Sequence, residues 1–159
     1  MSLKINKFNL KYGENIPVDK FLNKILYKPN VGYYSKKYPF GKEGDFITSP
    51  TISNLFSEIV AIWIVSFWEN LGKPKKINLI ELGPGDGSLS KILLNTFQRF
   101  PEFNKAVSIY LLEKSNLLIN FQKKKIKDKK VKWIKNYDNI KRGPVIFFGN
   151  EYFDAIPIK

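Results

Sequence analysis

The stretch Ile77-Asn78-Leu79-Ile80-Glu81-Leu82-Gly83-Pro84-Gly85-Asp86-Gly87-Ser88 decides the fold of this 159-residue chain. Its first six residues are mostly apolar and are typical of a buried strand, and a helical pattern follows the glycines from Ser88 to about Phe100. Gly83 permits a sharp bend, Gly85 lets a ligand approach the backbone, and Gly87 lets helix and strand pack closely. The strand, turn and helix together predict a nucleoside-binding unit.

The sequence after this turn predicts an α/β fold. Further strands are expected at residues 107–112, 131–134 and 145–148, and a helix at residues 115–127 with Leu117, Leu118 and Phe121 inward. Strands that alternate with helices indicate a Rossmann-like parallel sheet with helices on both faces. Because such a sheet normally has roughly five or more strands, we expect a domain truncated after its fourth strand. A longer protein or a second chain would complete it.

The sequence before the turn predicts a smaller N-terminal part. Pro17 begins a short helix that runs to about Tyr27, and residues 28–49 are typical of a long loop. Ser49-Pro50 is a favourable helix start. The helix that follows has an apolar surface wide enough to predict burial on more than one side. We therefore predict a helix and loop cap over residues 1–49 and the incomplete first half of the nucleoside-binding domain over residues 50–159.

The composition excludes several kinds of chemistry. The chain contains no cysteine and no histidine, which rules out disulfides, thiolate zinc sites, cysteine nucleophiles and imidazole bases within this stretch, and we predict no metal site. The net charge of +13 comes almost entirely from lysine, with arginine only at positions 99 and 142. Since arginine is preferred for bidentate phosphate and base contacts, a nucleic-acid partner is not expected.

The first ten residues predict no targeting segment. They lack both the apolar core of a secretory signal and the composition of a transit peptide. The longest apolar stretch, residues 59–67, is too short to span a bilayer, so no membrane insertion is expected. The expected location is the cytoplasm.

The detailed pattern of the glycine turn favours one cofactor. Dinucleotide enzymes need a glycine at the position that Ser88 occupies here, and the Asp86 carboxylate would oppose a pyrophosphate. An acidic residue followed by three alternating glycines fits the cationic amino-acid end of S-adenosylmethionine. Glu113, at the end of the second expected strand, can accept hydrogen bonds from both ribose hydroxyls.

Four motifs in order resemble the MidA family of class I S-adenosylmethionine-dependent methyltransferases. The resemblance extends from about Pro17 to Lys159, the N-terminal part of such a protein. It rests on Gly32-Tyr33-Tyr34, Gly44-Asp45-Phe46-Ile47-Thr48-Ser49-Pro50, Glu81-Leu82-Gly83-Pro84-Gly85-Asp86-Gly87 and Asn150-Glu151-Tyr152-Phe153-Asp154-Ala155-Ile156-Pro157.

The resemblance implies methyl transfer from S-adenosyl-L-methionine on a seven-stranded methyltransferase fold. The family includes the mitochondrial complex I assembly arginine methyltransferase, which implies a protein substrate, with a respiratory complex I subunit as the acceptor. Three alternatives stay open: a small-molecule methyltransferase, a noncatalytic assembly or binding factor that retains the cofactor crevice, and an NAD-dependent enzyme. The sequence predicts no oligomeric state.

Two groups of candidate site residues follow. Glu151 and Asp154 come after the fourth strand, and carboxylates there could orient a guanidinium by bidentate hydrogen bonds. The alternative for Asp154 is a helix-terminal carboxylate. The candidates for cofactor binding are Glu81, Gly83, Pro84, Gly85, Gly87, Glu113, Asn150, Asp45, Thr48 and Ser49. Asn150 and Ser49 could instead cap helices.

Other aromatic and basic residues are weaker candidates. Trp133 and Tyr137 could stack on adenine, although core packing is the better interpretation of Trp133. Tyr33 and Tyr34 could line the site or simply pack in their loop. The lysine-rich run at residues 123–130 is interpreted as a solvated helix end, with a docking surface for an acidic partner as the alternative.

Overall fold

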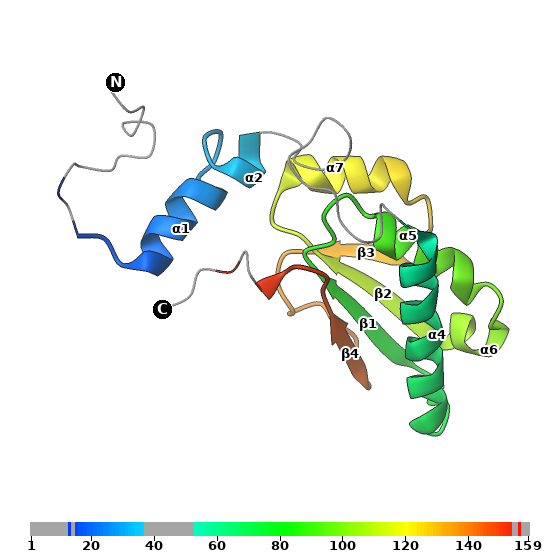
Figure 1. The fold of residues 1–159 in the computed structure, drawn as a ribbon. Helices are drawn as coiled ribbons and strands as arrows, with labels where there is room; N and C mark the ends of the chain where they lie inside the picture. The colour runs from blue at the N-terminus through cyan, green and yellow to red at the C-terminus, as the bar shows by residue number, and fades with distance from the viewer. Residues whose placement is uncertain (1–12, 14, 37–52, 154–155, 157–159) are drawn as a thin grey trace. The chain divides into compact units, whose positions relative to one another are not determined.

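The computed structural model describes residues 13, 15–36, 53–153 and 156 (Figure 1). The chain divides into two compact units, one formed by Met1–Pro39 with Glu151–Lys159 and the other by Phe40–Asn150. The predicted boundary at residue 50 stays a prediction. The larger unit contains the glycine turn.

A four-stranded parallel sheet forms the centre of the larger unit. Its strands are β1 (Ile77–Leu82), β2 (Val107–Leu112), β3 (Val131–Ile134) and β4 (Val145–Phe148), and their order in the sheet is β3-β2-β1-β4. All four strands have the predicted bounds. The expected parallel α/β fold, with four strands in this chain, is therefore confirmed.

The register of the sheet brings the carboxyl ends of the strands to one edge. Leu82 at the end of β1 pairs with Leu112 at the end of β2, and Glu81 pairs with Phe148 at the end of β4. Each strand continues into a turn at this edge. The glycine turn, Glu113 and Gly149-Asn150 consequently leave the sheet from neighbouring strands.

Helices cover one face of the sheet. They include α4 (Asn54–Asn70), α5 (Ser88–Phe97) and α6 (Pro101–Ala106), and α4 packs along α5 (Figure 1). Alternate residues of β1 and β2 point toward these helices. The resulting core contains Ala61, Ile64, Val65, Trp68, Ile77, Leu79, Leu89, Leu93, Leu94, Phe97, Phe103, Val107, Ile109, Leu111, Ile126, Val131 and Ile146.

The segment between β3 and β4 contacts the opposite face. The side-chain amide of Asn78 donates to the Lys141 carbonyl oxygen at 2.7 Å, and the backbone amide of Lys141 donates to the Tyr110 hydroxyl at 3.3 Å. The Tyr137 ring meets Phe147 edge to face at 5.8 Å. These contacts hold the loop against buried Tyr110 in place of a helix.

The structure corrects the start and the burial of α4. The helix begins at Asn54, and its N-cap is Ser53, whose hydroxyl accepts a hydrogen bond from the Leu55 amide at 3.2 Å. The predicted start at Ser49-Pro50 lies outside the described residues. Only one side of α4 is buried, contrary to the prediction. Its exposed apolar residues are Leu55, Phe56, Ile59, Ile62, Trp63 and Phe67.

Two more helices differ in detail from the expectation. The helix expected from Ser88 to about Phe100 ends at Phe97, and Pro101 begins a separate helix, α6, because the fixed φ of proline suits a first helical turn. Helix α7 (Asn116–Lys125) buries Leu118, Ile119 and Gln122, whereas Phe121 is exposed. A glutamine therefore occupies an inward position that the apolar pattern had assigned to its neighbour.

The N-terminal unit contains α1 (Val18–Tyr27) and α2 (Tyr33–Lys36), so the expected long loop includes a short helix. A side chain at Gly32 would lie 2.5 Å from the Lys28 nitrogen, which explains the glycine there. Tyr34 stacks on Tyr27 at 5.7 Å and meets Tyr33 edge to face at 5.2 Å. None of the described helices in either unit is long and apolar enough to cross a membrane.

The core predicts the effect of one truncation. Phe97 is fully buried and packs edge to face on Phe103 at 4.8 Å. We expect Phe97→Ala to lower the free energy of unfolding by about 3–5 kcal/mol, because it removes buried apolar surface and leaves a cavity. Urea denaturation would measure the loss, with exposed Phe147→Ala as the control. Equal effects of the two substitutions would contradict this description of the core.

Candidate functional site

Three left-handed glycines build the turn after β1. The φ angles of Gly83, Gly85 and Gly87 are 60°, 55° and 76°, a region that other residues rarely adopt. The Gly83 amide donates to the Leu112 carbonyl oxygen at 3.1 Å, which joins the turn to the end of β2. A Cβ atom at Gly87 would lie 3.1 Å from Ile126 Cδ1, so the turn also lies directly against the end of α7.

Asp86 stabilises the start of α5 from within the turn. Its carboxylate accepts hydrogen bonds from the Ser88 amide at 2.9 Å, the Ser88 hydroxyl at 2.6 Å and Lys125 Nζ at 2.6 Å. Desolvation acts to raise the pKa of Asp86, but the hydrogen bonds from Lys125 and Ser88 outweigh it and hold the pKa below its usual value. The Ser88 amide is thus already occupied by a carboxylate, which disfavours a pyrophosphate there.

Glu113 lies where the sequence predicted it, directly after β2. One oxygen of its carboxylate accepts from the Ser115 amide at 2.8 Å, and the other accepts from Gln122 Nε2 at 3.4 Å. Desolvation is the largest influence on this carboxyl and raises its pKa, while these hydrogen bonds oppose the shift. A carboxylate offers about four acceptor positions, and the backbone of Lys114 is a further donor to Glu113, so the carboxylate keeps capacity for about one more hydroxyl group.

Gln122 is a site residue that sequence reasoning missed. It donates from Nε2 to the Gly85 carbonyl oxygen at 2.9 Å, and its Oε1 accepts from Trp133 Nε1 at 2.9 Å. Together with its contact to Glu113, these bonds connect the glycine turn, the second strand and the third. The available signal was a polar residue three and four positions after buried Ile119 and Leu118, on the same face of a helix.

Glu81 is buried between β1 and α5. Its carboxyl accepts a hydrogen bond from the Ser90 hydroxyl, and only 2% of the residue is exposed. Burial raises the pKa of Glu81 from 4.5 to about 7, while the Ser90 hydrogen bond acts in the opposite direction. Glu81 therefore supports the turn from the side of the helix layer.

The structure does not bring all predicted residues into this group. Pro84 is buried in the turn, and Asn150 is half-buried after β4, beside the end of β1. Glu151 is exposed, has a φ of 52° and belongs to the N-terminal unit. The remaining candidates, Asp154, Asp45, Thr48 and Ser49, lie outside the described residues.

The aromatic candidates of the third strand have structural contacts. Trp133 packs against the core, as the better interpretation predicted, and its indole nitrogen bonds to Gln122. Tyr137 is half-exposed against Phe147. Neither contact indicates a stacking platform for adenine.

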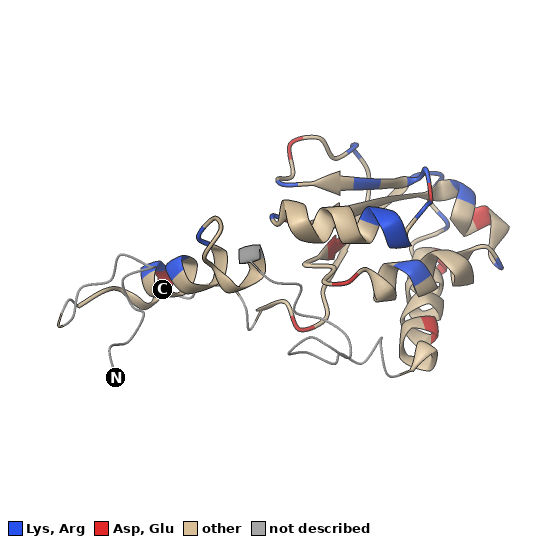
Figure 2. Cartoon of the chain, turned by 90° about the horizontal axis from the view of Figure 1, so that it is seen from above, with Lys and Arg blue, Asp and Glu red and all other residues tan. Residues whose placement is uncertain are grey.

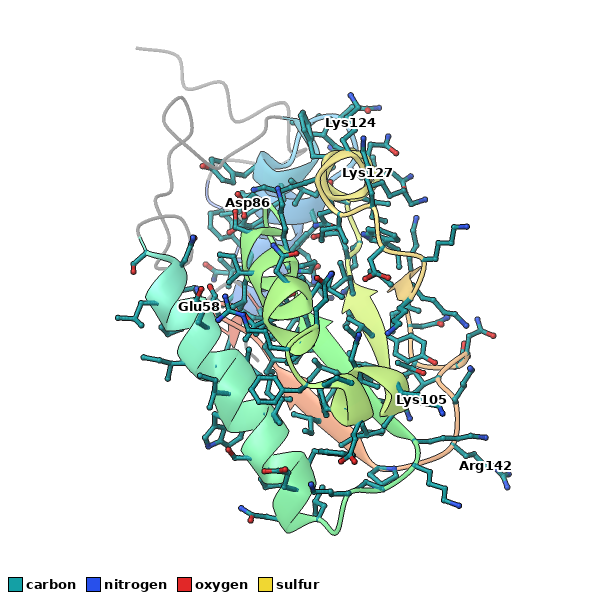
Figure 3. All side chains as sticks on the ribbon, turned by 90° about the vertical axis from the view of Figure 1, so that its right-hand side faces the viewer. Glu58, Asp86, Lys105, Lys124, Lys127 and Arg142 are labelled. Atoms are coloured by element: carbon teal, nitrogen blue, oxygen red, sulfur yellow. The ribbon has the colours of Figure 1, made fainter. Side chains whose placement is uncertain are left out.

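The lysine run ends α7 and continues into the following loop. Figure 2 shows basic residues on α7 and on several other elements. Lys123 and Lys124 are exposed, as expected for a solvated helix end, but Lys125 is the ion-pair partner of Asp86. In Figure 3, Asp86 lies near Lys124 and Lys127, at the opposite end of the unit from Lys105 and Arg142.

The sheet order, the glycine turn after β1 and the acidic residue after β2 define a nucleoside-binding α/β domain of the class I methyltransferase type. A family model described as "Putative S-adenosyl-L-methionine-dependent methyltransferase" matches residues 59–159. The chain belongs to this family, which confirms the resemblance to MidA-type proteins.

Longer proteins resemble nearly the whole chain. The mitochondrial protein arginine methyltransferase NDUFAF7 of Xenopus laevis is 31% identical to this chain, and the match covers 95% of this chain and 40% of the relative. The Caenorhabditis elegans homolog is 34% identical, with coverage of 90% and 39%. The chain therefore spans about 40% of the length of these relatives.

A solved structure has the same fold. It is a Burkholderia thailandensis protein bound to S-adenosyl-homocysteine, 25% identical to this chain, with a TM-score of 0.69. The match covers 89% of this chain and 38% of that protein. The similarity therefore includes most of the sheet and helices described above.

The buried carboxyl of Glu81 predicts a pH-dependent stability. Its pKa is raised in the folded protein, so its contribution to stability is complete below pH 4.5 and is lost as the pH rises through about 7. We expect the stability of Glu81→Gln, which carries no charge, to rise relative to that of the wild type by up to about 3 kcal/mol as the pH increases from about 5 to about 8. Urea denaturation across this range would measure the difference.

The matched control is Glu102→Gln, because the Glu102 side chain is 77% exposed. Its stability relative to the wild type should change little over the same pH range. If the free energies of unfolding of the Glu81 and Glu102 variants depend on pH in the same way, the Glu81 carboxyl is not buried with a raised pKa.

Proposed function

We propose that this protein is part of an S-adenosylmethionine-dependent methyltransferase and holds the cofactor between the glycine turn and Glu113. The observation that carries this proposal is their convergence at one edge of the sheet, where Gln122 contacts both Gly85 and Glu113. The family description and the S-adenosyl-homocysteine in the Burkholderia protein support the same cofactor.

The chemistry of the residues fits this cofactor. The positive φ angles at Gly83 and Gly85 belong to glycines, which leave the backbone free of side-chain bulk. Glu113 has remaining acceptor capacity for a ribose hydroxyl. The backbone amide of Ser88 already donates to the Asp86 carboxylate and is not available to a dinucleotide pyrophosphate, which favours S-adenosylmethionine over NAD.

S-adenosylmethionine supplies an activated methyl group for in-line transfer to a nucleophile. The role of the chain is then to bind and orient the reactants, because alignment accounts for much of the acceleration of such a displacement. Glu113 would hold the sugar, and the turn from Gly83 to Gly87 would lie along the amino-acid end. Glu81, Pro84, Asn150, Asp45, Thr48 and Ser49 complete the proposed cofactor contacts.

The proposed acceptor is an arginine side chain of a protein. The relatives are named protein arginine methyltransferases, which supports this class of substrate. A subunit of respiratory complex I is the specific acceptor that we propose, with the cytoplasm as the location. Glu151 and Asp154 are the proposed carboxylates that orient the guanidinium.

The backbone at Glu151 supports a functional position. A φ of 52° costs a non-glycine residue about 1–2 kcal/mol. Such strain is often found at functional sites, where the surrounding structure maintains it. A carboxylate held in this conformation directly after Asn150 is a reasonable group to orient an acceptor.

The role of Glu113 can be tested by cofactor binding. In the complete protein, we expect Glu113→Ala to weaken S-adenosylmethionine binding roughly 100-fold, because a hydrogen bond to a charged acceptor contributes up to about 3 kcal/mol. Isothermal titration calorimetry would measure the dissociation constant. Exposed Glu102→Ala is the matched control, and NAD is the competing ligand.

Two results would overturn the proposal. One is binding of NAD in preference to S-adenosylmethionine by the wild type. The other is unchanged S-adenosylmethionine binding by Glu113→Ala. A protein that binds the cofactor but methylates neither a protein nor a small molecule would instead be a noncatalytic binding factor.

Glu151 predicts a separate effect on transfer. We expect Glu151→Gln to reduce methyl transfer about 100-fold through misalignment of the acceptor, without a change in S-adenosylmethionine binding. Transfer of radiolabelled methyl groups to respiratory-complex subunits would measure activity, and amino-acid analysis would identify methylarginine. Full transfer by Glu151→Gln would remove this residue from the proposed mechanism.

A further inference from the structure

Gln122 joins the two parts of the cofactor site through a fully buried side chain. Its amide nitrogen donates to the Gly85 carbonyl oxygen at 2.9 Å and to Glu113 Oε2 at 3.4 Å. We propose that Gln122 is a positioning residue that fixes the glycine turn relative to the Glu113 carboxylate. This inference rests on the proposed function, because these two groups are the proposed contacts to the cofactor.

The partners of Gln122 determine the orientation of its amide. The Gly85 carbonyl and the Glu113 carboxylate only accept hydrogen bonds, so the NH₂ group must face them. The Trp133 indole nitrogen only donates, so the amide oxygen must face it, at 2.9 Å. Glutamine provides both a donor and an acceptor at this reach, whereas glutamate would place a second acceptor against Gly85.

The backbone of the turn depends on the same part of α7. At Gly87, an added Cβ atom would lie 3.3 Å from Gln122 Cγ and 3.1 Å from Ile126 Cδ1. Lys125 lies about one helical turn after Gln122, and its Nζ bonds to Asp86 Oδ2 and to the Ser88 hydroxyl, both at 2.6 Å. The end of α7 therefore holds the turn on both sides of Gly87.

These contacts have a specific consequence for Glu113. Its second oxygen has Gln122 as a side-chain donor, while the first accepts from the Ser115 amide. Without Gln122, the carboxylate would lose this side-chain donor and keep the backbone donors of Ser115 and Lys114. A ligand that needs both the turn and the carboxylate binds best when their separation is set before it arrives.

The test compares one substitution at two glutamines of the complete protein. Gln122→Met keeps an unbranched side chain of similar length but removes the three hydrogen bonds. We expect S-adenosylmethionine to bind about tenfold more weakly, as loss of one to two net hydrogen bonds would produce. Gln98→Met, at an exposed position at the end of α5, should bind like the wild type.

A double-mutant cycle separates positioning from a general effect on folding. If Gln122 acts through Glu113, Gln122→Met should cost clearly less than tenfold in a Glu113→Ala background, which has no side-chain acceptor at position 113. Equal losses in both backgrounds would overturn the proposal. If Gln122→Met fails to fold, Gln122→Glu keeps the shape and the acceptor toward Trp133, and it should also weaken binding.

The outcomes distinguish this inference from the proposed function. If neither the wild type nor Gln98→Met binds S-adenosylmethionine, the proposed function fails and the inference fails with it. If the wild type binds S-adenosylmethionine and both Gln122→Met and Gln122→Glu bind it as tightly as the wild type, only the role of Gln122 is refuted. Weaker binding with non-additive losses supports both.

Discussion

The structure depends on the reversal of the chain after β1. Left-handed backbone at Gly83, Gly85 and Gly87 carries the chain from the buried strand into α5, and a Cβ atom at Gly87 would be in tight contact, at 3.1 Å, with Ile126 at the end of α7. The turn is thus fixed by its own conformation and by close packing from a helix nearly 40 residues later, as the contact of Gln122 with Gly85 shows. The parallel register then brings Glu113 to the same place.

Polar groups around this turn are paired rather than left for a ligand to satisfy. Asp86 is neutralised by Lys125 and caps the start of α5, and Glu81 is held by Ser90. Glu113 leaves the sheet directly after β2, where it accepts from Ser115 and Gln122, and it is the carboxyl that we propose for the ribose. This division of roles among acidic residues follows from where each leaves the sheet.

Local patterns were sufficient to predict the strands and the glycine turn, because short apolar runs and glycine spacing are properties of neighbouring residues. Ser53 as the cap of α4 and Pro101 as the start of α6 required a choice between equally good local signals. Gln122 could not be found that way, since its partners come from the glycine turn, β2 and β3. The predicted role of Glu151 in orienting the acceptor stays a prediction, because Glu151 belongs to the N-terminal unit and not to the unit that contains the glycine turn.

The uncovered apolar side of α4 has a practical consequence. Trp63 is 58% exposed and Ile59 is 56% exposed on a helix that is otherwise part of the core, and among the described strands β4 pairs only with β1. An unpaired strand edge and an exposed apolar helix surface each favour aggregation. Expression of this segment by itself would call for a solubilising fusion or a chaperone, and crystallisation trials belong with a longer polypeptide.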